Sequence, residues 1–301
     1  MSRPPDASPD PPPSREVGER LARNRARPVV LSIRSLEKRY EGSDGSFLAL
    51  RGLHLDVRHR EFICVIGRSG CGKSTLIRII AGLEEPTGGE ILLDGKAVHG
   101  PGPERGMVFQ AYTLFPWLTV RGNVVFGLKM AGAERERAEY EAMRWIDLVG
   151  LGGFANHYPD QLSGGMKQRV AIARALASRP RILLMDEPFG ALDSQTRTRM
   201  QGYLLKICRR VDVTVVFITH DLDEAIFLAD RVVVLPPRPG PVQHVMDVPL
   251  PRPRRREHLL DPTFIRARRH LDAFIHEDEP DDEPEVPVHG LADEVRDVLE
   301  F

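Results

Sequence analysis

A glycine-rich segment with one lysine is the clearest site of chemistry in the sequence. Residues 67–74 read GRSGCGKS and lie between the apolar run 62–66 and a segment with helical spacing. The glycines let consecutive backbone N–H groups turn inward, and the following helix adds the positive end of its dipole. A loop of this pattern between a strand and a helix binds the triphosphate of a nucleotide.

Two side chains of this loop have predicted roles of their own. Lys73 is expected to meet the β- and γ-phosphates, and the Ser74 hydroxyl is expected to join the shell of a bound Mg²⁺. The residues predicted to contact the nucleotide here are Gly67, Arg68, Ser69, Gly70, Cys71, Gly72, Lys73, Ser74 and Thr75.

A pair of carboxylates supplies the second site of chemistry. Asp186 and Glu187 directly follow the apolar run 182–185. Ligands of open α/β sheets bind at the carboxyl ends of the strands, so the pair is expected beside the glycine-rich loop. We assign Asp186 to Mg²⁺ through a water molecule, and Glu187 to the attacking water as general base. Together with the loop, the pair favours a hydrolase over a phosphate carrier, although kinases, GTPases and recombinases share both motifs.

The elements that position these groups are predicted to form an α/β domain with a mainly parallel sheet. Short apolar runs alternate along the chain with longer amphipathic segments, a pattern typical of this class. Residues 120–178 are rich in helical patterns and are interpreted as an insertion into this core. Strands are predicted near 29–34, 52–57, 61–66, 90–94, 106–109, 181–185, 214–218, 231–236 and 242–248. Helices are predicted near 73–82, 120–129, 133–149, 165–178, 195–209 and 222–229.

Composition excludes several classes of protein. The 301 residues carry 42 Lys and Arg against 43 Asp and Glu, a net charge of −1 that gives no whole-molecule case for nucleic-acid binding. No apolar run approaches the ~20 residues of a spanning helix, and the N-terminus lacks the apolar core of a signal peptide. The three cysteines have no ligand-pair spacing, so reduced thiols without zinc are expected at Cys64, Cys71 and Cys208.

Both ends of the chain differ in composition from the region 29–250, which we take as the folded domain. Residues 1–28 hold seven prolines in a polar background and are expected to form a disordered tail. Residues 251–301 are expected to form a charged tail with a short helix near 262–275. The acidic run 277–285, EDEPDDEPE, is interpreted as a solvated segment, with a regulatory or partner-binding role as the alternative.

Residues 162–169, LSGGMKQR, indicate which family of nucleotide-binding proteins the chain resembles. Here the sequence resembles the ATP-binding subunit of ATP-binding-cassette (ABC) transporters, whose signature reads LSGGQ or a close variant; Met166 stands where glutamine is commonest. Ser163, Gly164 and Gly165 would open a helix and form a second anion site from free amides and a hydroxyl. The resemblance implies a head-to-tail dimer, in which each ATP lies between the glycine-rich loop of one subunit and these three residues of the other.

Four further positions match motifs of this family in the expected order. The resemblance implies that Tyr40 stacks on adenine and that Gln110 senses Mg²⁺ and the reacting water. It also implies that Asp193 lies in a loop that contacts the opposite subunit, and that His220 is the switch histidine near the γ-phosphate.

The resemblance also sets the expected fold and cofactors. The fold is a P-loop NTPase ABC cassette with a RecA-like core, an antiparallel β subdomain and a helical subdomain at about 111–178. The cofactors are ATP and Mg²⁺, with the metal held by Ser74, Gln110 and Asp186. The residues implied in catalysis are Glu187, His220 and Gln110.

The segment 112–120, YTLFPWLTV, indicates which kind of transport system the ATPase belongs to. It is apolar for a surface loop, and Trp117 is predicted to contact a separate permease, with packing onto the helical subdomain as the alternative. Together with LLMDEPFGALD at 183–193, it looks most like the importer group for nitrate, alkanesulfonates, taurine and bicarbonate. The implied partners are a second copy of the chain, an integral-membrane permease and a solute-binding protein, without nucleic acid. The implied location is the cytoplasmic face of the inner membrane, as a peripheral subunit.

Other functions match the sequence less well than that of an importer ATPase; a translation-type ABC protein, for example, would carry two cassettes in one chain, and the sequence holds one. An exporter ATPase is the strongest alternative. A non-transport ABC ATPase of DNA repair would show a long coiled-coil insertion, whereas Lys73 and Ser163 lie only 90 residues apart without sustained heptads. A scaffold that binds ATP without turnover is disfavoured by the presence of Lys73, Asp186, Glu187 and His220.

Overall fold

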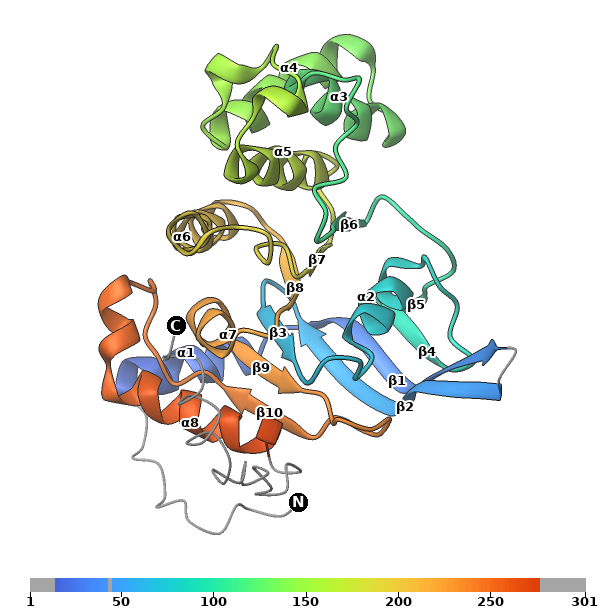
Figure 1. The fold of residues 1–301 in the computed structure, drawn as a ribbon, viewed down its shortest axis with the longest axis vertical. Coiled ribbons are helices and arrows are strands. Elements are labelled where there is room, and N and C mark those ends of the chain that lie inside the picture. The colour runs from blue at the N-terminus through green and yellow to red at the C-terminus, as the bar shows by residue number, and fades with distance from the viewer. Residues whose placement is uncertain (1–13, 43–44, 277–301) are drawn as a thin grey trace, which may run out of the picture.

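The computed structural model describes residues 14–42 and 45–276, which form two sheets surrounded by helices (Figure 1). The larger sheet has five parallel strands and one antiparallel edge strand. Its spatial order is β10 (His244–Asp247), β9 (Arg231–Val234), β3 (Phe62–Ile66), β8 (Thr214–Ile218), β7 (Ile182–Asp186) and β6 (Arg105–Val108). The smaller, antiparallel sheet has the order β2 (Gly45–Arg58), β1 (Val29–Gly42), β4 (Gly88–Leu93) and β5 (Lys96–Ala97).

The central strand β3 shows why the parallel sheet forms. All five of its residues are buried, as expected for a strand covered on both faces. Because neighbouring side chains of a strand point to opposite faces, Ile63 and Val65 join the core shared with the antiparallel sheet and α2 (Lys73–Ala81). Cys64 and Ile66 join the core on the other face, together with α5 (Gly164–Ala177), α6 (Ser194–Arg210) and α7 (Leu222–Leu228).

Helices α3 (Val120–Met130), α4 (Arg135–Leu148) and α5 pack against one another. Figure 1 shows them as a group at one end of the molecule, on the far side of α6 from the antiparallel sheet. Two short 3₁₀ turns, η1 (Gly152–Phe154) and η2 (Pro159–Gln161), link α4 to α5. The α/β class and the parallel core are confirmed, while the division into a domain of 29–250 with a helical part at 111–178 stays a prediction.

The expectation that residues 1–28 are disordered is wrong for residues 14–28. Helix α1 (Arg15–Arg25) begins after the N-cap Ser14, whose hydroxyl accepts from the Val17 amide, and the Val17 side chain is buried. Arg20 of this helix forms an ion pair with Asp230 at 3.0 Å. Six of the seven prolines behind the expectation lie in residues 1–13, which are outside the described residues.

At the other end, the predicted helix near 262–275 is present as α8 (Pro262–His276) after the turn η3 (Arg256–Leu260). It is part of the folded body rather than a tail, because Phe264, Leu271 and Phe274 are buried in the core that also holds α7. The acidic run 277–285 lies outside the described residues. In the described part of the chain, no helix combines the length and apolar character that crossing a membrane requires.

Candidate nucleotide-binding site

The glycine-rich loop runs from the end of β3 to the start of α2, as its pattern predicts. Gly72 caps α2 in the left-handed region with φ 95°, and a Cβ there would lie 2.7 Å from the carbonyl oxygen of Ala49. The N-cap residue Gly72 has no side chain, so no N-cap side chain occupies the amides of the first turn. Such free amides, together with the helix dipole, form a binding site for an anion.

Lys73 is buried within this loop. Its ammonium donates to the carbonyl oxygens of Gly67 at 2.8 Å and Arg68 at 2.9 Å. Cys71 lies beside it, with 3.9 Å between Lys73 Nζ and Cys71 Sγ. Burial raises the pKa of the Cys71 thiol, although the nearby ammonium opposes this effect, so the thiol is the favoured form. All three cysteines are free thiols, as expected.

Ser74 and Asp186 are adjacent at the ends of α2 and β7. The Ser74 hydroxyl donates to Asp186 Oδ1 at 3.3 Å. Burial raises the pKa of Asp186; the bond from Ser74 opposes this shift and the charge of Glu187 adds to it. A hydroxyl and a carboxylate side by side are the hard oxygen ligands that Mg²⁺ prefers, and a cation would favour the ionised form of Asp186.

Glu187 and His220 form the second half of the site. Glu187 has a left-handed backbone with φ 42°, and its amide donates to the Ile218 carbonyl at 3.1 Å, which fixes it at the end of the sheet. Its Oε2 lies 3.2 Å from Nδ1 of His220. Gln110, just after β6, approaches the same place: a Cβ on Gly190 would lie 3.7 Å from Gln110 Nε2 and 3.9 Å from Glu187 Oε2.

Lys73, Ser74, Glu187 and His220 line one pocket of about 380 Å³, whereas Asp186 and Gln110 are not among its lining residues. Five residues of the glycine-rich loop line it, together with Glu187 and His220. It is lined by Phe47, Ala49, Ser69, Gly70, Gly72, Lys73, Ser74, Thr75, Glu187 and His220. The structure therefore brings the predicted phosphate loop and the predicted catalytic carboxylate to one cavity, within the volume range of small-molecule sites.

Tyr40 and Phe47 form an aromatic edge beside this pocket. Strands β1 and β2 pair Tyr40 directly with Phe47, and the Tyr40 hydroxyl contacts Glu84 and lies 3.3 Å from Thr75 Oγ1. Burial and the bond to Glu84 raise the pKa of Tyr40, so its hydroxyl stays neutral. Phe47, an exposed aromatic residue, was not predicted from the sequence. It could have been found by recognising the β-hairpin that pairs it with Tyr40.

The predicted second anion site is not part of this pocket. Ser163 caps α5, where its hydroxyl accepts from the Met166 amide at 3.4 Å, and Asp193 caps α6, where its carboxylate accepts from the Thr196 amide at 2.9 Å. Gly165 allows α5 to approach α6 closely, since a Cβ there would lie 2.8 Å from Thr196 Cγ2. None of Ser163, Gly164, Gly165 and Asp193 lines the pocket. Within one chain, the two predicted anion-binding elements therefore do not line the same pocket.

Comparison with known proteins gives a consistent result. A family model described as "ABC transporter" matches residues 50–190. The chain is 48% identical over 251 residues to the nitrate import ATP-binding protein NrtD of Synechocystis sp., covering 81% of this chain and 94% of that protein. It is 46% identical over 254 residues to the bicarbonate transport ATP-binding protein CmpC of Synechococcus elongatus, covering 83% of this chain and 38% of that protein.

Solved structures match as well. The dimeric structure of MJ0796, a bacterial ABC transporter cassette, superimposes with a TM-score of 0.64 at 35% identity, covering 72% of this chain and 98% of that chain. The same cassette in a post-hydrolysis state bound to ADP and phosphate matches with a TM-score of 0.63. The cassette fold expected from the sequence is thereby confirmed.

Proposed function

The chain belongs to the family of ABC transporter ATP-binding proteins, and from this premise we propose that it hydrolyses ATP as a homodimer to drive a separate importer of a small anion, such as nitrate or bicarbonate. The main support for ATP hydrolysis is that Lys73 lines the same pocket as the Glu187–His220 pair. The nitrate and bicarbonate transport functions of the related proteins support the class of solute.

In the proposed reaction, the phosphates of ATP lie in the glycine-rich loop. Lys73 exchanges its two carbonyl partners for phosphate oxygens, which pair better with its charge. Glu187 accepts a proton from a water molecule as that water attacks the γ-phosphorus and the bond to the bridging oxygen breaks. His220 positions the Glu187 carboxylate through their 3.2 Å contact.

Adenine and metal have proposed places as well. Tyr40 and Phe47 offer exposed rings beside the pocket on which adenine would stack. Mg²⁺ would be held by Ser74, Gln110 and Asp186, and when bound it supplies positive charge to the phosphate oxygens.

A second copy would complete the site. Ser163, Gly164 and Gly165 lie outside the pocket of their own chain, and we propose that they bind the nucleotide held by the partner copy, with Asp193 at the same interface. The dimeric neighbour MJ0796 supports this arrangement. ATP would then bind the closed dimer more tightly than the open one, so hydrolysis would let the copies separate.

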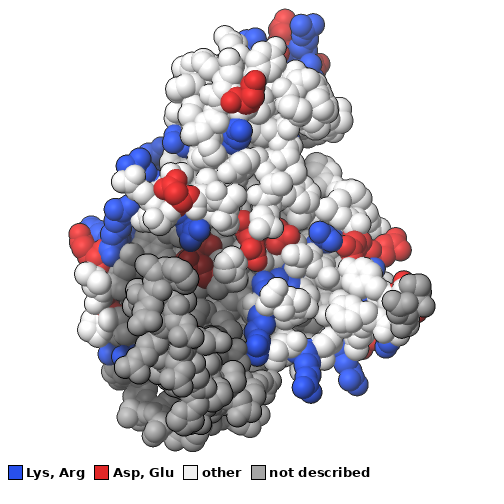
Figure 2. Space-filling view, in the orientation of Figure 1, with Lys and Arg blue, Asp and Glu red and all other residues white. Residues whose placement is uncertain are grey.

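The segment before α3 is the proposed contact with the permease. Trp117 is 70% exposed, and its ring lies 5.4 Å from that of Phe115, centroid to centroid. The loop is held by Asn123, which is fully buried, accepts from the Phe115 amide at 2.9 Å and donates to the Leu118 carbonyl at 3.0 Å. On the face shown in Figure 2, the surface over the group of helices α3 to α5 is mostly uncharged. An exposed tryptophan on a rigid loop is typical of an interface anchor.

This proposal predicts a membrane-bound complex at the cytoplasmic face. Tagged full-length chain, recovered from solubilised membranes of its own host, is expected to co-purify with a polytopic permease and a solute-binding protein. Trp117→Ala is expected to reduce recovery of the permease more than tenfold, because a buried interface tryptophan contributes about 2 kcal/mol or more. Mass spectrometry of the recovered proteins, with solute uptake in parallel, is the measurement.

Tyr140→Ala is the matched control, since Tyr140 is 66% exposed on α4 and lies outside the proposed contact. It should recover the permease as the parent does. Recovery of a permease without a binding protein would favour the exporter alternative, and recovery of soluble proteins alone would contradict a transport role.

A further inference from the structure

We infer that the chain has a second, non-catalytic ligand site, an arginine-rich pocket between α1 and the amino ends of β3 and β8 that binds a small molecule carrying clustered phosphate groups. The pocket has a volume of about 450 Å³, enough for a ligand the size of a nucleotide. It lies at the opposite ends of the strands from the ATP pocket, since β3 begins at Phe62 here and ends at the glycine-rich loop.

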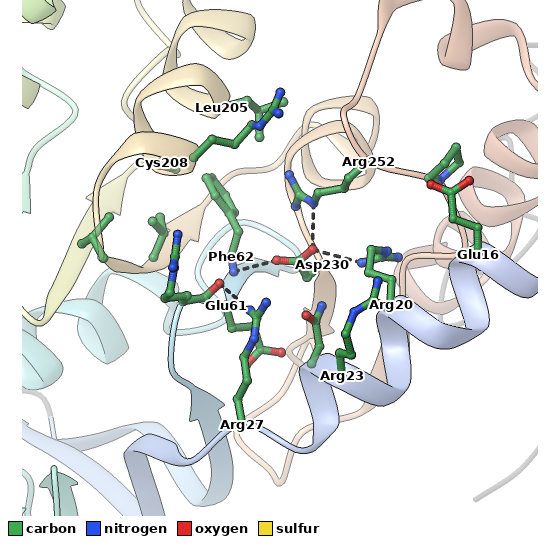
Figure 3. A pocket seen from close by; sticks show the side chains of 16 residues that line it. Glu16, Arg20, Arg23, Arg27, Glu61, Phe62, Leu205, Cys208, Asp230 and Arg252 are labelled. Atoms are coloured by element: carbon green, nitrogen blue, oxygen red, sulfur yellow. Dashed lines mark hydrogen bonds and ion pairs between the residues drawn. The ribbon is translucent and has the colours of Figure 1, made fainter.

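The pocket carries a surplus of positive charge. Six arginines line it against three carboxylates. Two of the carboxylates are already engaged: Asp230 lies between Arg20 at 3.0 Å and Arg252 at 2.8 Å, and Glu61 forms an ion pair with Arg231 at 2.9 Å. Figure 3 shows Arg20 and Arg23 reaching from α1 toward Asp230, with Arg252 on another side of it. The third carboxylate, Glu16, is exposed on α1.

Several guanidinium groups in this pocket lack a carboxylate partner or have a donor without an acceptor. Within residues 14–42 and 45–276, the side chains of Arg23 and Arg209 form no hydrogen bond or ion pair. Arg27 contacts only backbone carbonyl oxygens, those of His59 and Arg60. The Nε of Arg20 is buried without a partner, on a side chain that is only 11% exposed. A buried donor of this kind is costly unless a ligand accepts from it.

The electrostatic surroundings agree with this charge surplus. Burial, and then repulsion from Arg252 and Arg20, lowers the pKa of neighbouring Arg254 to about 8. The pKa of Arg20 is also lowered, first by burial and further by Arg252, in spite of the attraction of Asp230. Each added negative charge in the pocket would relieve this repulsion.

These features select the class of ligand. Guanidinium forks bind phosphate through paired hydrogen bonds, so phosphate matches the side chains present. Among the lining residues the arginines exceed the carboxylates by three, and one of them, Arg60, pairs at 3.6 Å with Asp212, which does not line the pocket. One singly charged anion would therefore leave positive charge in the pocket uncompensated. Two or more linked phosphates would contact α1 and the end of α6 at once, through Arg23 and Arg209.

Inorganic pyrophosphate is the probe that tests this site. Its binding to the full chain is measured by calorimetry at low salt, with saturating ADP and Mg²⁺ so that the ATP pocket is filled. The double variant Arg23→Ala, Arg209→Ala is expected to weaken pyrophosphate binding at least tenfold and leave ADP affinity unchanged. Both side chains are exposed, so the fold should persist.

The matched control is Arg15→Ala, Arg199→Ala, which removes one exposed arginine from each of the same two helices outside the pocket. It should bind pyrophosphate within twofold of the parent, and sulfate should bind the parent at least tenfold more weakly than pyrophosphate. Absence of pyrophosphate binding to the parent would overturn the inference. Equal weakening in both double variants would also overturn it, and so would sulfate binding as tight as pyrophosphate binding.

Discussion

Glu187→Gln is expected to slow ATP hydrolysis by about 10²- to 10³-fold and to leave ATP affinity within a few fold of the parent, because removing a general base forfeits a rate factor of that order. The amide keeps the size of the carboxylate and can still contact His220, 3.2 Å away in the parent, but it cannot accept the proton of the attacking water. Phosphate release and fluorescent-nucleotide binding measure the two quantities separately.

The same variant should change the oligomeric state. With hydrolysis blocked, ATP remains in the site, so the closed dimer should accumulate and be visible by size-exclusion chromatography. Glu90→Gln is the matched control, since Glu90 is an exposed carboxylate on β4 outside the pocket. Hydrolysis by Glu187→Gln at the parental rate would refute the assignment of the base.

Lys73→Ala is expected to weaken ATP binding by about 30- to 100-fold, because a charge-assisted contact with phosphate contributes roughly 2–3 kcal/mol. The ammonium is buried and held within the loop by the carbonyl oxygens of Gly67 and Arg68, so it lies beside the proposed phosphate position before ATP binds. Equilibrium binding of a fluorescent ATP analogue measures the change.

Lys96→Ala, an exposed lysine on β5, is the control and should bind ATP as the parent does. Thermal unfolding of both variants separates loss of a contact from loss of the fold. Parental affinity in Lys73→Ala would show that the phosphates lie elsewhere.

The parts of the fold that follow from local sequence were predictable. The runs 62–66 and 182–185 are continuously apolar because both faces of their strands are covered, and the sequence places the glycine-rich loop and Asp186 directly after them. The approach of Glu187 to His220 was expected only through the family resemblance, since the two residues are 33 positions apart.

The parts that depend on distant partners were not predictable. Helix α1 is fixed by contacts such as that of Arg20 with Asp230, 210 positions away, and its local composition gave no sign of them. For the same reason the arginine-rich pocket was not predicted: its arginines come from α1 and the segment after it, the turn between β2 and β3, α6 and the segment after β10, and they converge only in the folded chain. Phe47 was missed because its place beside the nucleotide loop depends on the register of β1 and β2.

Mixing two inactive variants tests most directly whether the ATP site is shared between two copies. Lys73→Ala removes the loop contact, and Ser163→Arg blocks the other half-site at an exposed helix N-cap, at a cost of about 1 kcal/mol for the lost cap. Each variant alone should be inactive.

In an equal mixture, half of the dimers are mixed, and each mixed dimer holds one intact site of two, so activity should return to at most about a quarter of the parental rate. If the site were complete within one chain, no mixed dimer would contain an intact site. Recovered ATP hydrolysis on mixing is therefore expected, and an inactive mixture in which native mass spectrometry shows that mixed dimers have formed would contradict a site shared between two copies.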